Sequence, residues 1–205
     1  MQPTAGRACC LASLYENTSI PSHARSRQRW LILFSLGRKY KMNNSVTITI
    51  RNVETSDISI FFEQQLDLEA NRMAAFVRDD PHDRAAFDAH WKRIMDSTGI
   101  VKKTILRGEE VAGHISCYPQ EGELEVTYWL GKKHWGKGVA TQALKKLLQE
   151  ITHRPLFARA AKDNIRSIRV LQKCDFKIID ENKDFAQGRG EETEEYIFRL
   201  DGEIQ

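Results

Sequence analysis

The chain has 205 residues, of which 41% are hydrophobic and 29% are charged. This length supports one globular domain with a well-formed core, and it is too short for two full domains. The formal charge is only +3, from 31 Lys and Arg residues against 28 Asp and Glu residues. A net charge this small argues against a protein that coats nucleic acid and against an acidic disordered chain.

The cysteines and the short apolar runs indicate the expected compartment. Cys9 and Cys10 are adjacent, whereas Cys117 and Cys174 lie far apart, which is typical of neither a disulfide scaffold nor a metal-binding CxxC pair. The longest apolar run covers residues 30–36, whereas a membrane-spanning helix needs roughly 20 apolar residues. We therefore expect a cytoplasmic protein with reduced thiols and no membrane-spanning segment.

The first fifth of the chain differs from the rest. Residues 1–41 contain seven basic residues and one acid, a charge of +6, so residues 42–205 carry −3. Because no regular hydrophobic period appears, we expect residues 1–45 to be a disordered extension and 46–205 to be the folded domain. Three interpretations of the extension stay open: annotated translation upstream of a true start at Met42, a cleaved transit peptide, or a functional basic arm.

The first half of the domain is expected to contain one strand, two helices and a strand meander. Val46–Arg51 alternates apolar and polar residues as a half-buried strand does, and Thr55–Asp57 then offers cap residues for a helix. A second helix is expected to open at Asp80–Pro81, with proline in its first turn, and to end at Ser97–Gly99. Three turn-separated segments predict an antiparallel meander: 101–106, 110–118 and 122–130.

The second half mixes helices and strands. Val139–Ile151 places apolar residues on one helical face, and Arg154–Pro155 ends that helix. The remaining elements are a buried strand at 156–161, a helix at 164–174, and strands at 176–180 and 194–200. The acidic run 191–195 could attract a cationic acceptor, but we expect it to be a solvated loop. This order predicts an α/β fold of the α+β type.

The most informative segment is the turn between the last meander strand and the following helix. Gly136 and Gly138 are separated by one residue, and glycines here let backbone N–H groups approach a ligand closely. The free amides and the dipole of the helix favour a phosphate group. Three lysines add positive charge: Lys132, Lys133 and Lys137. The alternative is an ordinary glycine-rich connection, and neither a GxxxxGK(S/T) loop nor a dinucleotide fingerprint is present.

A second constellation lies downstream. Asn164 stands at the start of a helix that follows a strand, and Ser167 and Leu171 lie on the same side at i+3 and i+7. Asn164 could be an ordinary N-cap and Ser167 a solvent-facing hydroxyl, or both could face a ligand.

Together the two segments resemble the GNAT superfamily of acetyl-CoA-dependent N-acetyltransferases, most closely its RimJ/RimL-type branch. Lys133-x-x-Gly136-x-Gly138 is similar to the acyl-CoA signature Q/R-x-x-G-x-G/A, with Lys in place of Gln or Arg. The resemblance covers about residues 46–200. It implies a mixed, mostly antiparallel central sheet flanked by helices.

The segment that begins at Asn164 is similar to the branch motif N-x-x-S-x-x-x-L-x-K-x-G-F. The matching residues are Asn164, Ser167, Leu171, Lys173 and Phe176. Asp175 replaces the usual glycine, where the helix end needs a left-handed residue, at a cost of about 1 kcal/mol. Leu171 stands where many members have a general-acid tyrosine, so that role is vacant.

The resemblance implies acetyl-CoA as co-substrate, no metal, and direct transfer of the acetyl group to a primary amine in a ternary complex. The amine is a protein N-terminal α-amine or a small-molecule amine. The positions carried over for cofactor binding are Tyr128, Trp129, Leu130, Lys133, His134, Trp135, Gly136, Lys137, Gly138, Val139, Ala140, Thr141, Asn164, Ser167 and Lys173.

The same resemblance suggests catalytic roles. Glu125 is the candidate base, and Glu123 is its rival because strand alternation puts both on one face. Either could also be a surface carboxylate. Ser167 is the candidate acid or donor to the thiolate, Asn164 would hold the pantetheine arm, and a backbone N–H around 128–130 would face the oxyanion.

Other residues are interpreted as structural. His90 and Trp91 have helical spacing and are expected in the core rather than at an acceptor opening. Cys117 and Cys174 are expected to be buried, inert thiols. Two functions of other classes stay open, namely a non-catalytic acyl-CoA-binding or sensing domain, and a nucleic-acid-binding protein that uses its basic arm. We expect no nucleic-acid or membrane partner, and a monomer and a homodimer both stay open.

Overall fold

The computed structural model describes residues 46–77 and 80–202, so the disorder predicted for residues 1–45 lies outside the described residues. The elements are β1 (Ile48–Asn52), α1 (Asp57–Gln65), α2 (Leu68–Ala74), α3 (Arg84–Asp96), β2 (Val101–Arg107), β3 (Glu110–Gln120), β4 (Glu123–Leu130), the short helix η1 (Lys132–His134), α4 (Val139–Glu150), β5 (Leu156–Ala161), α5 (Ile165–Gln172), β6 (Lys177–Ala186) and β7 (Glu191–Leu200).

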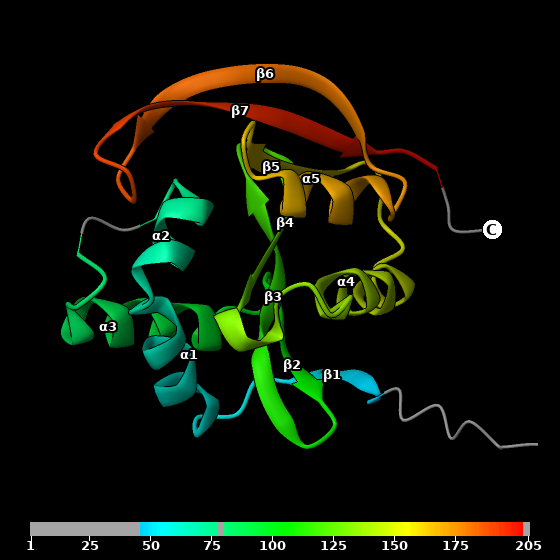
Figure 1. Ribbon diagram of the computed structural model, residues 1–205. Coiled ribbons are helices and arrows are strands. Elements are labelled where there is room, and N and C mark those ends of the chain that lie inside the picture. Colours follow the sequence, from blue (N-terminus) through cyan, green and yellow to red (C-terminus); the bar gives the residue numbers. More distant parts are fainter. Residues whose placement is uncertain (1–45, 78–79, 203–205) are drawn as a thin grey trace, which may run out of the picture. The chain divides into compact units, whose positions relative to one another are not determined.

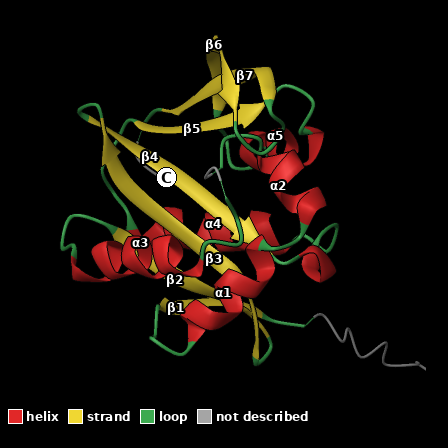
Figure 2. Ribbon diagram, turned by 90° about the vertical axis from the view of Figure 1, so that its left-hand side faces the viewer, coloured by secondary structure: helices red, strands yellow, loops and turns green. Residues whose placement is uncertain are grey.

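The strands form one sheet in the order β1-β2-β3-β4-β5-β7-β6. β4 and β5 are parallel, and every other neighbouring pair is antiparallel. Helices α1, α2 and α3 lie on one side of the sheet and α4 lies on the other (Figure 1). Figure 2 shows the same layers with α1 and α3 in front of β3. The predicted mixed, mostly antiparallel sheet flanked by helices is confirmed.

Helix α4 provides a large part of the core because its apolar residues recur on one face. The buried residues are the ones that the spacing predicted: Val139, Ala140, Ala143, Leu144, Leu147 and Leu148. Burial of each leucine side chain stabilises the fold by about 1.5–3 kcal/mol. Across the sheet, Phe61 of α1 packs with Phe87 and Trp91 of α3 in a second buried cluster. Trp91 is therefore a core residue, as expected.

Two helix predictions need correction. Helix α3 begins at Arg84 and not at Asp80–Pro81, because the side chain of Asp83 accepts a hydrogen bond from Ala86 N (2.9 Å) and caps the helix there. Pro81 lies in the preceding turn. Helix α2 was not predicted, since seven residues are too few to display a helical period clearly.

The acidic run 191–195 also departs from the expectation. It lies within β7 and pairs with β6, so the predicted solvated loop is wrong. Thr193 and Glu195 are buried, whereas the glutamates between and before them are exposed. This alternation follows from the period of two in a strand, and it turns Glu195 inward.

The end of helix α5 is fixed by Asp175, whose φ is 66°. Asp175 N donates to Gln172 O (3.1 Å) and Phe176 N donates to Leu171 O (3.2 Å), which are the two hydrogen bonds of a Schellman motif. The left-handed residue predicted at this position is confirmed. Among the described helices, none combines the length and the apolar character needed to cross a bilayer.

Candidate functional site

The sheet opens between β4 and β5. These neighbours share only two register pairs, Leu124 with Leu156 and Glu125 with Phe157. A cavity of about 710 Å³ lies beside the part of β4 that has no β5 partner, and residues of α2, α4 and α5 also line it. A concave site of this volume is typical of small-molecule binding.

The glycine turn forms one end of the cavity. Gly136 and Gly138 have φ values of 71° and 73°, which residues with a side chain rarely adopt. Gly138 is also the N-cap of α4, and no side chain caps this helix. The first-turn residues Val139, Ala140 and Thr141 all line the cavity. Their backbone N–H groups are therefore available to an anion.

The three lysines of the turn have other partners. Lys132 pairs with Glu69 of α2 (Nζ to Oε2, 2.5 Å), and Lys133 pairs with Glu110 at the start of β3. Lys137 donates to the backbone carbonyl of Lys133 (2.6 Å). None of these lysines lines the cavity, so the structure does not bring the predicted cofactor-binding residues Lys133 and Lys137 to its wall.

Positive charge reaches the cavity from α5 instead. Arg166, Arg169 and Lys173 line it at i, i+3 and i+7. The guanidinium of Arg166 lies over the Trp135 ring, 5.2 Å from its centroid. The ion pairs found among residues 46–77 and 80–202 include none of these three cations. Sequence reasoning missed both arginines, although their helical spacing to Lys173 was a usable signal.

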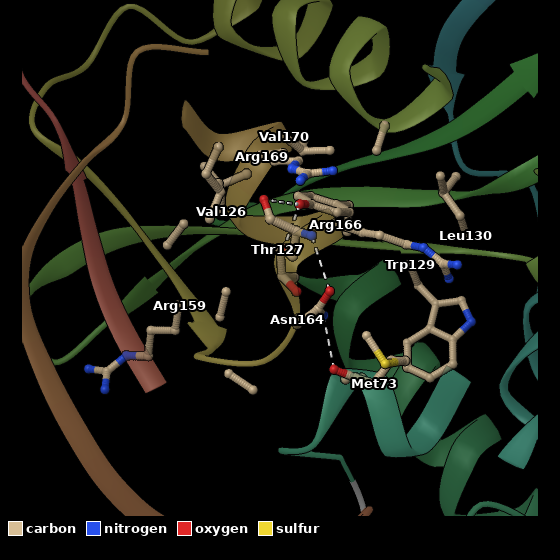
Figure 3. Close-up of a pocket in the computed structure, with 18 of the residues that line it drawn as sticks. Met73, Val126, Thr127, Trp129, Leu130, Arg159, Asn164, Arg166, Arg169 and Val170 are labelled. Carbon is tan, nitrogen blue, oxygen red and sulfur yellow. Dashed lines mark hydrogen bonds between the residues drawn. The ribbon is translucent and has the colours of Figure 1, made fainter. Parts of the chain in front are cut away.

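Asn164 links α5 to α2. Its Oδ1 accepts a hydrogen bond from Ser167 N (3.1 Å), so the predicted N-cap interpretation is confirmed. Its Nδ2 donates to the carbonyl of Met73 in α2 (2.9 Å). Figure 3 shows this link, with Arg166 and Arg169 of α5 above it. A carboxamide retains one further N–H and one lone pair for a ligand.

Of the two alternatives for Ser167, the solvent-facing hydroxyl is not the one observed. It lines the cavity, and its Oγ lies 2.7 Å from the hydroxyl oxygen of Tyr128 in β4. The pair therefore joins the part of β4 that has no β5 partner to the first turn of α5.

A row of three charged side chains, Glu125, Arg159 and Glu195, forms the other end of the cavity. Glu125 accepts from Arg159 Nε and from the Tyr118 hydroxyl, both at 3.4 Å, and Arg159 Nη1 donates to Glu195 (3.2 Å). The side chains of Glu125 and Glu195 are only 13% and 6% exposed. Burial raises the pKa of Glu125, Arg159 opposes this rise, and the nearby charge of Glu195 adds to it. Its rival Glu123 is exposed and does not line the cavity.

The tip of the β6–β7 hairpin contacts α2 and the residue that follows it, Ala75. Gly188 N donates to Ala75 O (2.8 Å), and a Cβ at Gly188 would lie only 2.5 Å from Asn71 O. Arg189 donates to the carbonyl of Arg72 (2.9 Å). Glycine is therefore required here by close approach of two backbones.

Most of the predicted cofactor-binding residues share this cavity. Those that line it are Tyr128, Trp129, Leu130, His134, Trp135, Gly136, Gly138, Val139, Ala140, Thr141, Asn164, Ser167 and Lys173. Cys117 and Cys174 are buried as expected, and burial raises the pKa of each thiol to about 11, so neither is a thiolate at neutral pH. Within the described ranges, no three His, Cys, Asp or Glu side chains gather as a metal-binding group.

A sheet parted beside a glycine turn and an uncapped helix N-terminus offers a site for an anionic ligand. Residues 47–177 match the family model of the acetyltransferase (GNAT) domain. The chain belongs to this family.

Individual relatives extend this finding. An uncharacterized N-acetyltransferase of Bacillus licheniformis, p20, is 32% identical over 108 residues, which cover 49% of this chain and 58% of the relative. RimJ of Mycobacterium smegmatis, solved with CoA-disulfide, has 15% identity and a TM-score of 0.62 over 75% of this chain and 81% of its own. Spermidine N-acetyltransferase of Vibrio cholerae, solved with CoA and spermine, has 12% identity and a TM-score of 0.63 over 75% of this chain and 94% of its own. At these identities the two structures establish a shared fold.

Proposed function

We propose that this protein is an acetyl-CoA-dependent N-acetyltransferase that moves the acetyl group to a primary amine by direct attack in a ternary complex. One observation carries this proposal: a single cavity has the uncapped N-terminus of α4 at one end and the Glu125 carboxylate at the other. Membership of the acetyltransferase family and the CoA-bound structures of the same fold support it.

Coenzyme A fits the glycine-turn end by charge and hydrogen bonding. Its pyrophosphate would accept hydrogen bonds from the first-turn N–H groups of α4, where the helix dipole favours an anion. Arg166, Arg169 and Lys173 would neutralise the phosphates. The pantetheine amides would run along β4, whose backbone beyond Glu125 has no β5 partner, and would pass Asn164.

The carboxylate end suits the chemistry of the amine. An amine attacks a thioester only when unprotonated, and we assign Glu125 as the base that takes its proton, directly or through water. A buried carboxylate with a raised pKa accepts a proton more readily than a surface one. As the N–C bond forms, the acetyl oxygen becomes negative and would face a backbone N–H of residues 128–130. The C–S bond then breaks, and Ser167 donates a hydrogen bond to the thiolate.

The charges of this end favour a cationic acceptor. Glu125 and Glu195 share one guanidinium, so the row of charges has an excess of one carboxylate at neutral pH. Such a site attracts an ammonium group and disfavours an acceptor with a carboxylate beside the amine. We therefore propose a small polyamine-like amine or a protein α-amine as acceptor. Proteins of the same fold are named for both kinds, namely spermidine N-acetyltransferase and RimL, the ribosomal L7/L12 α-N-protein acetyltransferase.

The test has two steps. Titration calorimetry with CoA and acetyl-CoA measures cofactor binding, and a screen of polyamines, amino-acid amides and short peptides, read by mass spectrometry, finds the acceptor. We expect both ligands to bind and at least one amine to gain an acetyl group. A folded protein that binds neither ligand would contradict the proposal. Binding without any acetylation, unchanged in Glu125→Gln and Ser167→Ala, would favour a non-catalytic acyl-CoA-binding domain.

A further inference from the structure

Tyr128 and Ser167 bring two hydroxyl groups together inside the cavity. Tyr128 comes from the part of β4 that has no β5 partner, and Ser167 comes from the first turn of α5. Their oxygen atoms are 2.7 Å apart, the usual distance for a hydrogen bond between two hydroxyls. Both residues line the cavity, so the pair is in contact with the space that a ligand would occupy.

The pair lies between the two charged ends of the cavity. Along β4, Tyr128 is three residues beyond Glu125, a separation of about 10 Å in a strand, and the glycine turn follows the strand. Side chains alternate along a strand, so Tyr128 and Glu125 point to opposite faces of β4, and both line the cavity where β4 has no β5 partner. A molecule that binds its phosphates at the turn and presents a reactive group near Glu125 would run along this part of β4 and past Tyr128. The sulfur of a CoA thioester is the atom next to the reacting carbon, so it falls in this region.

The two hydroxyls share a hydrogen bond of 2.7 Å in which either oxygen is a possible donor. The other contact of the Tyr128 hydroxyl, with the carbonyl oxygen of Ser167, is 3.5 Å long and therefore weak. The arrangement in which Tyr128 donates to Ser167 Oγ leaves the Ser167 O–H for a ligand in the cavity. Burial raises the pKa of Tyr128 to about 12, so the phenol keeps its proton at neutral pH.

We propose that Tyr128 is a positioning residue for thiolate departure: it donates to Ser167 Oγ and so directs the Ser167 O–H toward the sulfur of CoA. This inference rests on the proposed function. It also supplies a phenol hydroxyl near the place that Leu171 leaves without one, because Leu171 lies one helical turn after Ser167 and lines the same cavity.

The step balances without proton transfer from either hydroxyl. The amine nitrogen forms a bond to the acetyl carbon and gives its proton to Glu125. The C–S bond breaks, and its electron pair stays on sulfur as the CoA thiolate. Ser167 stabilises this charge with one hydrogen bond, and Tyr128 strengthens that bond by polarising the serine hydroxyl. Solvent protonates the thiolate after release.

The pKa of the thiol in bound CoA measures this interaction without any acceptor amine. The thiolate is followed by its ultraviolet absorbance as CoA is titrated with base in the presence of the full-length protein. A hydrogen bond to the charged form lowers a pKa, so we expect the bound thiol to titrate below free CoA. Ser167→Ala is expected to raise the pKa of the bound thiol by about one unit, the effect of one hydrogen bond to an ionised group. Tyr128→Phe is expected to raise it by a smaller amount, and the double variant by no more than Ser167→Ala alone.

Two controls separate positioning from a merely structural role. Tyr196→Phe removes a phenol hydroxyl from β7 outside the cavity, under Lys162, and should leave the pKa of the bound thiol unchanged. Desulfo-CoA lacks the sulfur, so its affinity should be the same in the wild type and in Tyr128→Phe.

Each outcome decides the proposal. A Tyr128→Phe variant that binds CoA with an unshifted thiol pKa overturns it, as does an additive double variant. A loss of desulfo-CoA affinity in Tyr128→Phe assigns the pair a structural role and also overturns it. A wild-type protein that binds no CoA overturns the proposed function itself, so the two failures are distinguishable.

Discussion

The two ends of the cavity differ in whether their charged groups have protein partners. At the glycine-turn end, α4 has no side-chain cap, and Arg166, Arg169 and Lys173 have no anionic partner among the described residues. At the carboxylate end, Glu125 and Glu195 are already held by Arg159. The first end offers unpaired charge to a ligand of fixed negative charge. The second holds two carboxylates on one guanidinium, an arrangement that adjusts the pKa of Glu125.

This contrast has a structural cause. The turn end combines the backbone N–H groups of one continuous stretch, the glycine turn and the first turn of α4, with the cations of a single helix, α5. The carboxylate end needs three strands, β4, β5 and β7, to bring its side chains together. Binding of the cofactor and activation of the amine should therefore respond separately to substitution.

The largest expected effect tests that separation. Glu125→Gln removes the proposed base, and the rate of acetyl transfer should fall by about 100-fold to 10,000-fold. The affinity for acetyl-CoA, measured by calorimetry, should stay within about twofold, because cofactor binding belongs to the other end. Glu123→Gln is the matched control, since this carboxylate lies two residues earlier on the same face but is exposed. A large loss in Glu123→Gln instead would reverse the assignment.

The charge balance at the carboxylate end can be shifted in both directions. Protonated Glu125 cannot act as a base, so kcat/KM should fall as the pH drops through its pKa. Arg159 lowers this pKa, so Arg159→Gln should move the acid limb to higher pH. The charge of Glu195 raises it, so Glu195→Gln should move the limb to lower pH. If the pH–rate profiles of both variants move in the same direction, Arg159 and Glu195 do not set the pKa of Glu125 in opposite senses, and this assignment is wrong.

The turn end is tested by a pair of cation substitutions. Arg169→Gln removes an unpaired cavity cation and should weaken CoA binding by about tenfold at low salt, the value of one charge-assisted hydrogen bond. Lys133→Gln removes a cation that is paired with Glu110 off the cavity wall and should change the affinity little. If Lys133→Gln has the larger effect in calorimetry, Lys133 leaves Glu110 and binds the phosphates when CoA is present. The assignment of the phosphate contacts to α5 instead of the turn lysines is then wrong.

The smallest effect concerns the frame that holds Ser167. Asp175→Gly relieves the cost of a left-handed aspartate at the end of α5 and should stabilise the protein by about 1 kcal/mol. This corresponds to a rise in Tm of about 2–4 °C for a chain of this size, measured by thermal unfolding. A lower Tm would mean that the Asp175 side chain contributes a stabilising contact that outweighs its backbone strain.

Much of the fold could be predicted because its signals are local. The spacing of Val139, Leu144 and Leu148 specified the buried face of α4, and alternation specified the meander strands. The turn glycines and Asn164 were likewise readable from short motifs. Helix α2 and the strand character of residues 191–195 were missed, because one is short and the other is dominated by charge.

The carboxylate end was only partly predictable. Glu125 could be proposed from its position on a strand, and the structure favours it over Glu123 by burial. The partnership with Arg159 and Glu195 depends on the pairing of β5 with β7, which no local pattern reveals. The turn lysines show the converse: proximity in sequence suggested a role at the phosphates, whereas tertiary contacts with Glu69 and Glu110 occupy two of them.

The two register pairs between β4 and β5 also affect how the sheet moves. They join a four-stranded part, β1 to β4, to a three-stranded part made of β5, β7 and β6. Of the strand-to-strand hydrogen-bond ladders, a tilt of one part against the other disturbs only the short ladder between β4 and β5. A ligand that spans the gap contacts both parts and restricts their relative motion. Its binding would therefore slow amide hydrogen exchange even in the outer strands, which the ligand does not contact.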